Sequence, residues 1–215
     1  MDIIINSINT MNSKNPTNPY TGIDKSWQIL KESNPQNIAE NTLTEFILQK
    51  NIFIVKYLNE NYAIDLNTKT IYNLKNNIKV TSFDFNLSIL IYMTTMDAEM
   101  PADKFISASE NPSVTQFFSK NHVIPADKLT KSFDNNFEEF KKKCISFGAK
   151  EYPFGDLGLQ FKVLPKGNIA IIYWKGDDEF PSNTTFLFEE MLINKMPPDS
   201  LWSFSKTIIK TLVEE

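Results

Sequence analysis

The chain has 215 residues, of which 41% are hydrophobic and 13% aromatic, so its composition supports a sizeable apolar core and excludes disorder of the whole chain. Its formal net charge is −4 and its lysines are scattered, which argues against nucleic-acid binding. No run approaches the roughly 20 apolar residues of a membrane span, and the start lacks the basic segment of a signal peptide, so we expect a cytoplasmic protein without membrane contact.

The sequence contains one cysteine, Cys144, and one histidine, His122. A single cysteine excludes an intramolecular disulfide, an iron–sulfur cluster held by this chain alone and a zinc site built from Cys and His. A Ser-His-Asp or Cys-His mechanism would have to use His122, which lies in a polar stretch and is expected at the surface. Cys144 is expected to be a buried, inert thiol.

Residues 1–20 are predicted to form a flexible N-terminal arm, because the segment is rich in Asn, Ser, Thr and Pro and shows no periodicity. Residues 21–215 are predicted to form a single α+β domain. Its first helix is predicted from Ile23, Trp27 and Leu30, which share one helical face. Asn34 is expected to end this helix and to act as the N-cap of a second, short one.

Four short β-rich runs separated by polar turns predict an antiparallel meander. The runs are Phe46 to Leu48, Ile52 to Leu58, Tyr62 to Leu66 and Thr70 to Leu74. A helix over 83–96 follows, and because it is apolar nearly all round it is expected to be buried, with Asp84 as its cap. The segment 100–118 is less regular, with an edge strand expected at 104–107 and a helical turn at 114–118.

Apolar residues at helical spacing predict one long helix after Pro125, ended by Gly148. Its stripe consists of Leu129, Phe133, Phe137, Phe140, Cys144 and Phe147. A final helix is predicted after Pro198 from a second such stripe. That stripe consists of Leu201, Phe204, Ile208 and Leu212.

A predicted hairpin forms the centre of the chain. Residues 157–163 alternate between apolar and polar, 165–168 are typical of a tight turn, and 169–174 form the most apolar run. With a third strand at 184–188, the hairpin makes a three-strand unit. The predicted fold is therefore α+β, with this unit and the meander packed against about three main helices. Whether the two strand groups join in one sheet stays open.

Acidic residues gather at the outer end of this hairpin. If the turn pairs Pro165 with Asn168, Asp156 falls opposite Asp177. Trp174 precedes the acids and is a candidate pocket wall. The other two acids of the cluster are Asp178 and Glu179.

Two interpretations of the cluster stay open. In the structural interpretation, the acids accept backbone N–H bonds and help to end the strand. In the functional one, Asp156, Asp177 and Asp178 hold Mg²⁺ or Ca²⁺, or perform acid/base chemistry.

The first function hypothesis is a binding or accessory module that recognises a small molecule or a partner protein at these acids and Trp174. It is favoured by the lack of phosphate-loop glycines and of a nucleophile–histidine set. The second is a carboxylate- or metal-dependent, hydrolase-like enzyme that uses the same acids. A toxin- or immunity-like interaction protein also stays open. Acids that converge in a cleft would favour the enzyme, and acids satisfied by backbone donors would favour the module.

Residues 22–214 resemble the DUF3786 family, bacterial proteins of unestablished function, in several motifs. The motifs are Tyr152-Pro153-Phe154-Gly155-Asp156, the run from Tyr173 to Pro181, Phe186 to Glu189 and Met196 to Leu201. The chain departs from the family at Glu189, where the resemblance implies an aspartate. Some relatives resemble fusions to a cysteine-rich iron–sulfur module, near corrinoid and one-carbon chemistry. The resemblance implies that any electron-transfer role here needs a partner, and it assigns no catalytic residue.

Overall fold

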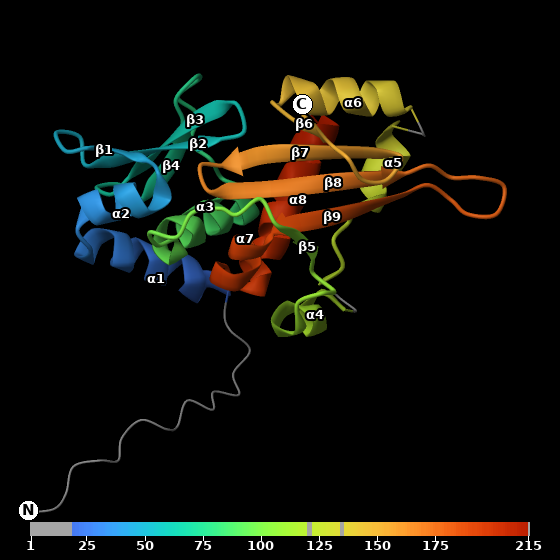
Figure 1. Ribbon diagram of the computed structural model, residues 1–215. Helices are drawn as coiled ribbons and strands as arrows, with labels where there is room; N and C mark the ends of the chain where they lie inside the picture. Colours follow the sequence, from blue (N-terminus) through green and yellow to red (C-terminus); the bar gives the residue numbers. More distant parts are fainter. Residues whose placement is uncertain (1–18, 120–121, 134–135, 215) are drawn as a thin grey trace, which may run out of the picture.

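The computed structural model describes residues 19–119, 122–133 and 136–214 (Figure 1). These residues form eight helices and two antiparallel sheets, of four and five strands, which confirms the predicted α+β class. Residues 1–18 of the predicted arm lie outside the described residues. The first helix already begins at Pro19, inside the range predicted as the arm.

The first sheet is the predicted meander, in the order β1-β2-β3-β4. Its strands are β1 Glu45–Ile47, β2 Ile52–Tyr57, β3 Glu60–Asp65 and β4 Thr70–Asn73. Phe53, Val55 and Ile64 share one face and are fully buried. The polar turns have the expected chemistry, since the Asp65 carboxylate accepts a hydrogen bond from the Asn67 N–H at 2.8 Å.

The second sheet has the order β5-β9-β8-β7-β6. Its strands are β5 Phe105–Ser107, β6 Lys150–Tyr152, β7 Leu157–Leu164, β8 Gly167–Trp174 and β9 Asn183–Glu189. The predicted three-strand unit is thus the centre of a five-stranded sheet. The expected edge strand at 104–107 is confirmed as β5, whereas β6 was not predicted because it has only three residues and two of them are exposed.

The predicted register of the β7–β8 hairpin is wrong. Leu157 pairs with Tyr173, so Asp156 falls opposite Trp174 rather than opposite Asp177. The antiparallel hairpin is present as expected, but its turn is one residue earlier, since Leu164 pairs with Gly167. On the other side of β8, Ile169 to Trp174 pair with β9.

Two features explain why Asp156 lies opposite Trp174. Leu164 pairs with Gly167 at the turn, where the prediction paired Pro165 with Asn168, and an irregularity in β7 then shifts the register by one further residue. The register shifts between Lys162 and Leu164, which leaves Val163 without a partner in β8. The Val163 carbonyl instead accepts a hydrogen bond from the Leu58 N–H at 2.8 Å. Leu58 directly follows β2, so this bond links the two sheets at one point.

The helices include more than the three main ones predicted. They are α1 Pro19–Glu32, α2 Pro35–Thr42, α3 Phe83–Thr95, α4 Pro112–Phe118, α5 Asp127–Phe133, α6 Phe137–Ser146, α7 Glu190–Lys195 and α8 Pro198–Glu214. Asn34 caps α2 as predicted. Asp84 does not cap α3: Ser82 does, by accepting a hydrogen bond from the Phe85 N–H. Asp84 instead pairs with Lys206 of α8 at 2.8 Å, which ties the two helices together.

The long helix expected between Pro125 and Gly148 is two helices, α5 and α6. Asn136 begins the second one, because its side chain accepts a hydrogen bond from the Glu139 N–H at 3.1 Å. The apolar stripe runs through both helices, and Phe133 of α5 contacts Phe140 of α6 with ring centroids 5.1 Å apart.

The turn end of the β7–β8 hairpin is fixed in the interior. The Tyr92 hydroxyl of α3 accepts a hydrogen bond from the Lys166 N–H at 3.0 Å and donates one to the Thr42 carbonyl of α2 at 2.7 Å. The Lys166 ammonium donates to the carbonyls of Asp97 and Glu99, at 2.7 and 3.0 Å. The inner end of the hairpin is therefore held by α3 and by the segment that follows it, and Thr42 of α2 holds Tyr92 in place.

Candidate functional site

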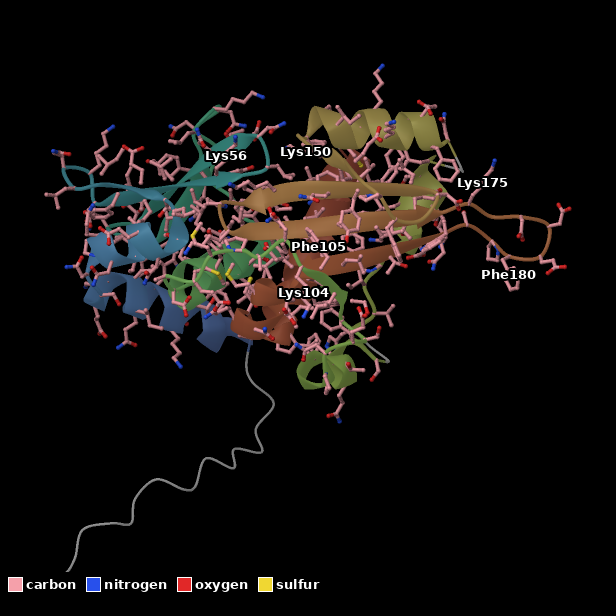
Figure 2. The ribbon with its side chains drawn as sticks, in the orientation of Figure 1. Lys56, Lys104, Phe105, Lys150, Lys175 and Phe180 are labelled. Carbon is pink, nitrogen blue, oxygen red and sulfur yellow. The ribbon has the colours of Figure 1, made fainter. Side chains whose placement is uncertain are left out.

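The outer end of the same hairpin carries the acids that the sequence singles out. Residues 175–182, which we call the tip loop, connect the end of β8 to the start of β9. In Figure 1 the tip loop projects from the body of the molecule, and Figure 2 shows Lys175 and Phe180 on it. The candidate site is thus convex.

Asp156 lies at the base of the tip loop. Its carboxylate accepts a hydrogen bond from the Lys175 N–H at 2.7 Å. This bond fastens the residue before β7 to the residue after β8. The two ends of the hairpin therefore meet through a carboxylate and a backbone amide, without Asp177.

Asp177 organises the tip loop from within. Its carboxylate accepts hydrogen bonds from the N–H groups of Phe180, at 2.7 Å, and Glu179, at 2.9 Å. Its own N–H donates to the Phe180 carbonyl at 2.8 Å. The hydrogen bond from the Phe180 N–H, and after it the one from the Glu179 N–H, lower the pKa of the Asp177 carboxyl below its ordinary value. These bonds hold the loop in one conformation.

Asp178 and Glu179 point into solvent and make no ion pair within the part of the chain that the structure describes. In that same part, no three His, Cys, Asp or Glu side chains lie where they could hold a metal ion. The carboxylates of Asp156 and Asp177 face different backbone donors. The arrangement offers exposed negative charge rather than a cage of ligands.

Exposed aromatic side chains flank the acids. Phe180 is 68% exposed, Phe154 is 53% exposed and Trp174 is 39% exposed. The Phe154 and Trp174 rings make an edge-to-face contact with centroids 5.7 Å apart. Gly155 has φ of +71°, and a Cβ there would lie 2.4 Å from the Ile172 side chain, so glycine is required where this segment passes over β8. Phe154 and Phe180 were not predicted as site residues, although aromatic residues beside acids after a strand are a readable signal.

Residues 34–211 match the family described as "Domain of unknown function (DUF3786)". The chain belongs to the DUF3786 family. The match covers both sheets and the motifs of the hairpin that carried the resemblance. No curated protein and no solved structure matches the chain. In this DUF3786 chain, no helix among the described residues is both long and apolar enough to cross a membrane.

Cys144 and His122 of the DUF3786 chain both pack among other side chains. Cys144 is fully buried, and burial raises the pKa of its thiol far above the ordinary value. His122 is partly buried rather than free at the surface, because its ring stacks on Phe117 at 4.1 Å and contacts Trp202 edge-on at 5.1 Å. The contacts of both side chains are therefore explained by packing.

Two buried charged groups were missed by sequence reasoning. Lys166 is 1% exposed, and burial lowers the pKa of its ammonium. Glu189 is 1% exposed, and burial raises the pKa of its carboxyl although Asp103 N–H and the Asn168 amide donate to it, at 3.1 and 2.9 Å. A lysine in a polar turn and a glutamate at a strand end are both expected to be exposed, so the local sequence did not predict their burial.

Proposed function

We propose that this DUF3786 chain is a binding module and that its tip loop docks a partner protein with a basic surface around an apolar recess. The observation that carries the proposal is Phe180, which is 68% exposed on a loop held in shape by the Asp177 hydrogen bonds. A large aromatic side chain on a loop that is already ordered loses little conformational entropy on binding. This property suits the central anchor of an interface.

The charge around this anchor indicates the kind of partner. Asp178 and Glu179 are exposed beside Phe180, and the whole chain carries a net charge of −4. Exposed charge at the rim of an interface increases the association rate of an oppositely charged partner. A protein partner suits this end better than a small molecule, because the loop is convex and small molecules bind in concave sites.

The alternative use of the same acids, as a metal-dependent hydrolase, has less support. Such a site needs several carboxylates around one ion or one water. Asp156 binds the Lys175 N–H and Asp177 binds two loop amides, so each carboxylate already has a structural partner.

Site-directed photo-crosslinking tests the proposal. A photoreactive residue at position 178 should capture one protein in the cells that express the chain, whereas the same residue at Leu48, which is 74% exposed in the turn after β1, should not. The captured protein is then purified and titrated against the unmodified chain.

Variants give the decisive comparison. Phe180→Ser should weaken binding at least about tenfold, as expected for an interface anchor. Asp177→Ala should also weaken it, because the loop loses its internal bonds, and Leu48→Ser should have no effect. Equal capture at positions 178 and 48, or full affinity of Phe180→Ser, would refute the proposal.

A further inference from the structure

We propose that a groove at the junction of the two sheets binds a small amphipathic anion, a molecule with a phosphate or carboxylate head group and an apolar body. The groove lies at the turn end of the β7–β8 hairpin, and the tip loop lies at the opposite end. The proposal therefore stands or falls independently of the partner-binding function.

The groove consists of two adjoining open cavities of about 390 and 360 Å³. Both are lined by Leu43, Gly148, Lys162 and Pro165. The first cavity is also lined by Leu58, whose N–H bonds to the Val163 carbonyl and so links the two sheets beside the groove. Cavities of this size accommodate a metabolite-sized ligand.

Three lysines line the groove: Lys56 from β2, Lys150 from β6 and Lys162 from β7. All three are exposed, and none forms an ion pair with another described residue. Figure 2 shows Lys56 and Lys150 near the junction of the two sheets. Asp103 is the one acid among the lining residues, so the groove carries excess positive charge on a chain that is negative as a whole.

The sheet geometry brings these lysines within reach of one head group. Lys150 pairs with Gln160 across β6 and β7, and Lys162 lies two residues further along the same face. Such diagonal neighbours lie roughly 7–8 Å apart or less, a distance that two lysine side chains can span to bind a single anion. The sequence contains 22 lysines and no arginine, so lysine is the permanently charged side chain that this protein can offer to an anion.

Apolar residues supply the rest of the surface. Leu58 and Leu164 are buried beneath the groove, while Leu43 and Met100 at its border are 47% and 58% exposed. Exposed apolar side chains next to unpaired lysines fit a ligand that has both an apolar and an anionic part. Inorganic phosphate alone would leave the apolar surface uncovered.

Displacement of the fluorescent anion anilinonaphthalene sulfonate measures binding directly. Octyl phosphate or octanoate should displace the dye, whereas octanol, which has the same chain without the charge, should not at equal concentration. The more effective of the two anions identifies the head group. Displacement by octanol as strong as by both anions would overturn the proposal, as would the absence of any dye binding.

Three variants test the role of the lysines. Lys162→Gln should raise the dissociation constant about fivefold, the effect of one charge at close range in water. Gln160→Glu, which keeps the size of the side chain, should raise it at least as much, because its carboxylate would pair with Lys150 or Lys162. Lys128→Gln removes an exposed lysine of α5, outside the groove, and should have no effect. Unfolding midpoints check that each variant is folded, and unchanged affinity in both groove variants would refute the proposal.

Discussion

Two fully buried tyrosines, Tyr92 and Tyr173, have hydroxyl groups in opposite surroundings. The Tyr92 hydroxyl bonds to the Thr42 carbonyl and to the Lys166 N–H, at 2.7 and 3.0 Å. The Tyr173 hydroxyl is buried beneath α6 without a hydrogen-bond partner among the described residues. Replacing each tyrosine by phenylalanine deletes the same oxygen from the two surroundings, so the two variants control for each other.

The expected free energies of unfolding differ in direction. Tyr92→Phe leaves a buried carbonyl and a buried N–H without partners, and each orphaned group costs about 1–3 kcal/mol. We expect a loss of about 3 kcal/mol, or roughly 9 °C in Tm for a chain of this size. Tyr173→Phe removes an unpaired polar group from an apolar site, so we expect stability between unchanged and about 1 kcal/mol higher.

Urea unfolding followed by circular dichroism measures both variants. The midpoints should move apart while the slope m stays the same, which shows that the native and unfolded states keep their compactness. If Tyr173→Phe loses as much stability as Tyr92→Phe, the hydrogen bonds of Tyr92 do not anchor the hairpin and the reasoning fails.

Two further predictions concern buried positions of the second sheet. Gly158→Ala should destabilise the fold by about 3 kcal/mol, because its Cβ would lie 2.3 Å from the backbone carbonyl of Tyr152. Gly22→Ala in α1 should cost much less, because its Cβ would lie 3.3 Å from the end of the Leu87 side chain, which can shift, and alanine favours the helix. Equal urea midpoints of the two variants would contradict this. Burial raises the pKa of Glu189 above its ordinary 4.5, so the folded state holds the extra proton and stability should fall as pH rises from 4.5 through the folded pKa. Glu189→Gln should not lose stability over this pH range, as measured by urea unfolding at a series of pH values. If the stability of the variant and of the unmodified chain changes with pH in parallel, Glu189 is not the cause of the loss.

Much of the fold follows from patterns that local physics controls. Alternation along 157–163 buries Leu159 and Phe161 on one face, so the strand was readable from spacing alone. The final helix was equally readable, because its apolar stripe has one period and begins at a proline. The break between α5 and α6 is a different case, because the apolar stripe continues across it. The sequence marks the start of α6 only by Asn136, the N-cap, whose side chain accepts a hydrogen bond from the Glu139 N–H.

The register was predicted wrongly because the turn pair is Leu164 with Gly167, and because a distant contact accompanies one further shift in β7. Val163 leaves the β7–β8 ladder to bond with Leu58, which is more than 100 residues earlier in the chain. The burial of Lys166 has the same kind of cause, since its ammonium is held by carbonyls from the segment after α3. Local propensity contains no information about such partners, and an error at the turn moves the opposite ends of the hairpin past each other.

The position of the acids in the fold was predicted, but their hydrogen-bond partners were not. The acids do lie together at the outer end of the hairpin, as the sequence implied. What spacing could not show is which groups their oxygens face. Asp156 and Asp177 find backbone amides at short range, and this leaves Asp178 and Glu179 as the exposed charges.

The two proposed sites lie at opposite ends of the β7–β8 hairpin, and the length of β8 separates them. β8 has eight residues and therefore spans about 25 Å. One end carries the tip loop and the other borders the lysine groove, whose turn is fixed by Tyr92 and Lys166. From Ile169 to Tyr173, β8 is paired with both β7 and β9, which resists local bending between the two ends. The Leu58–Val163 bond also ties the second sheet to the first beside the groove, which opposes movement of the second sheet as a unit. The structure thus favours two sites that act independently.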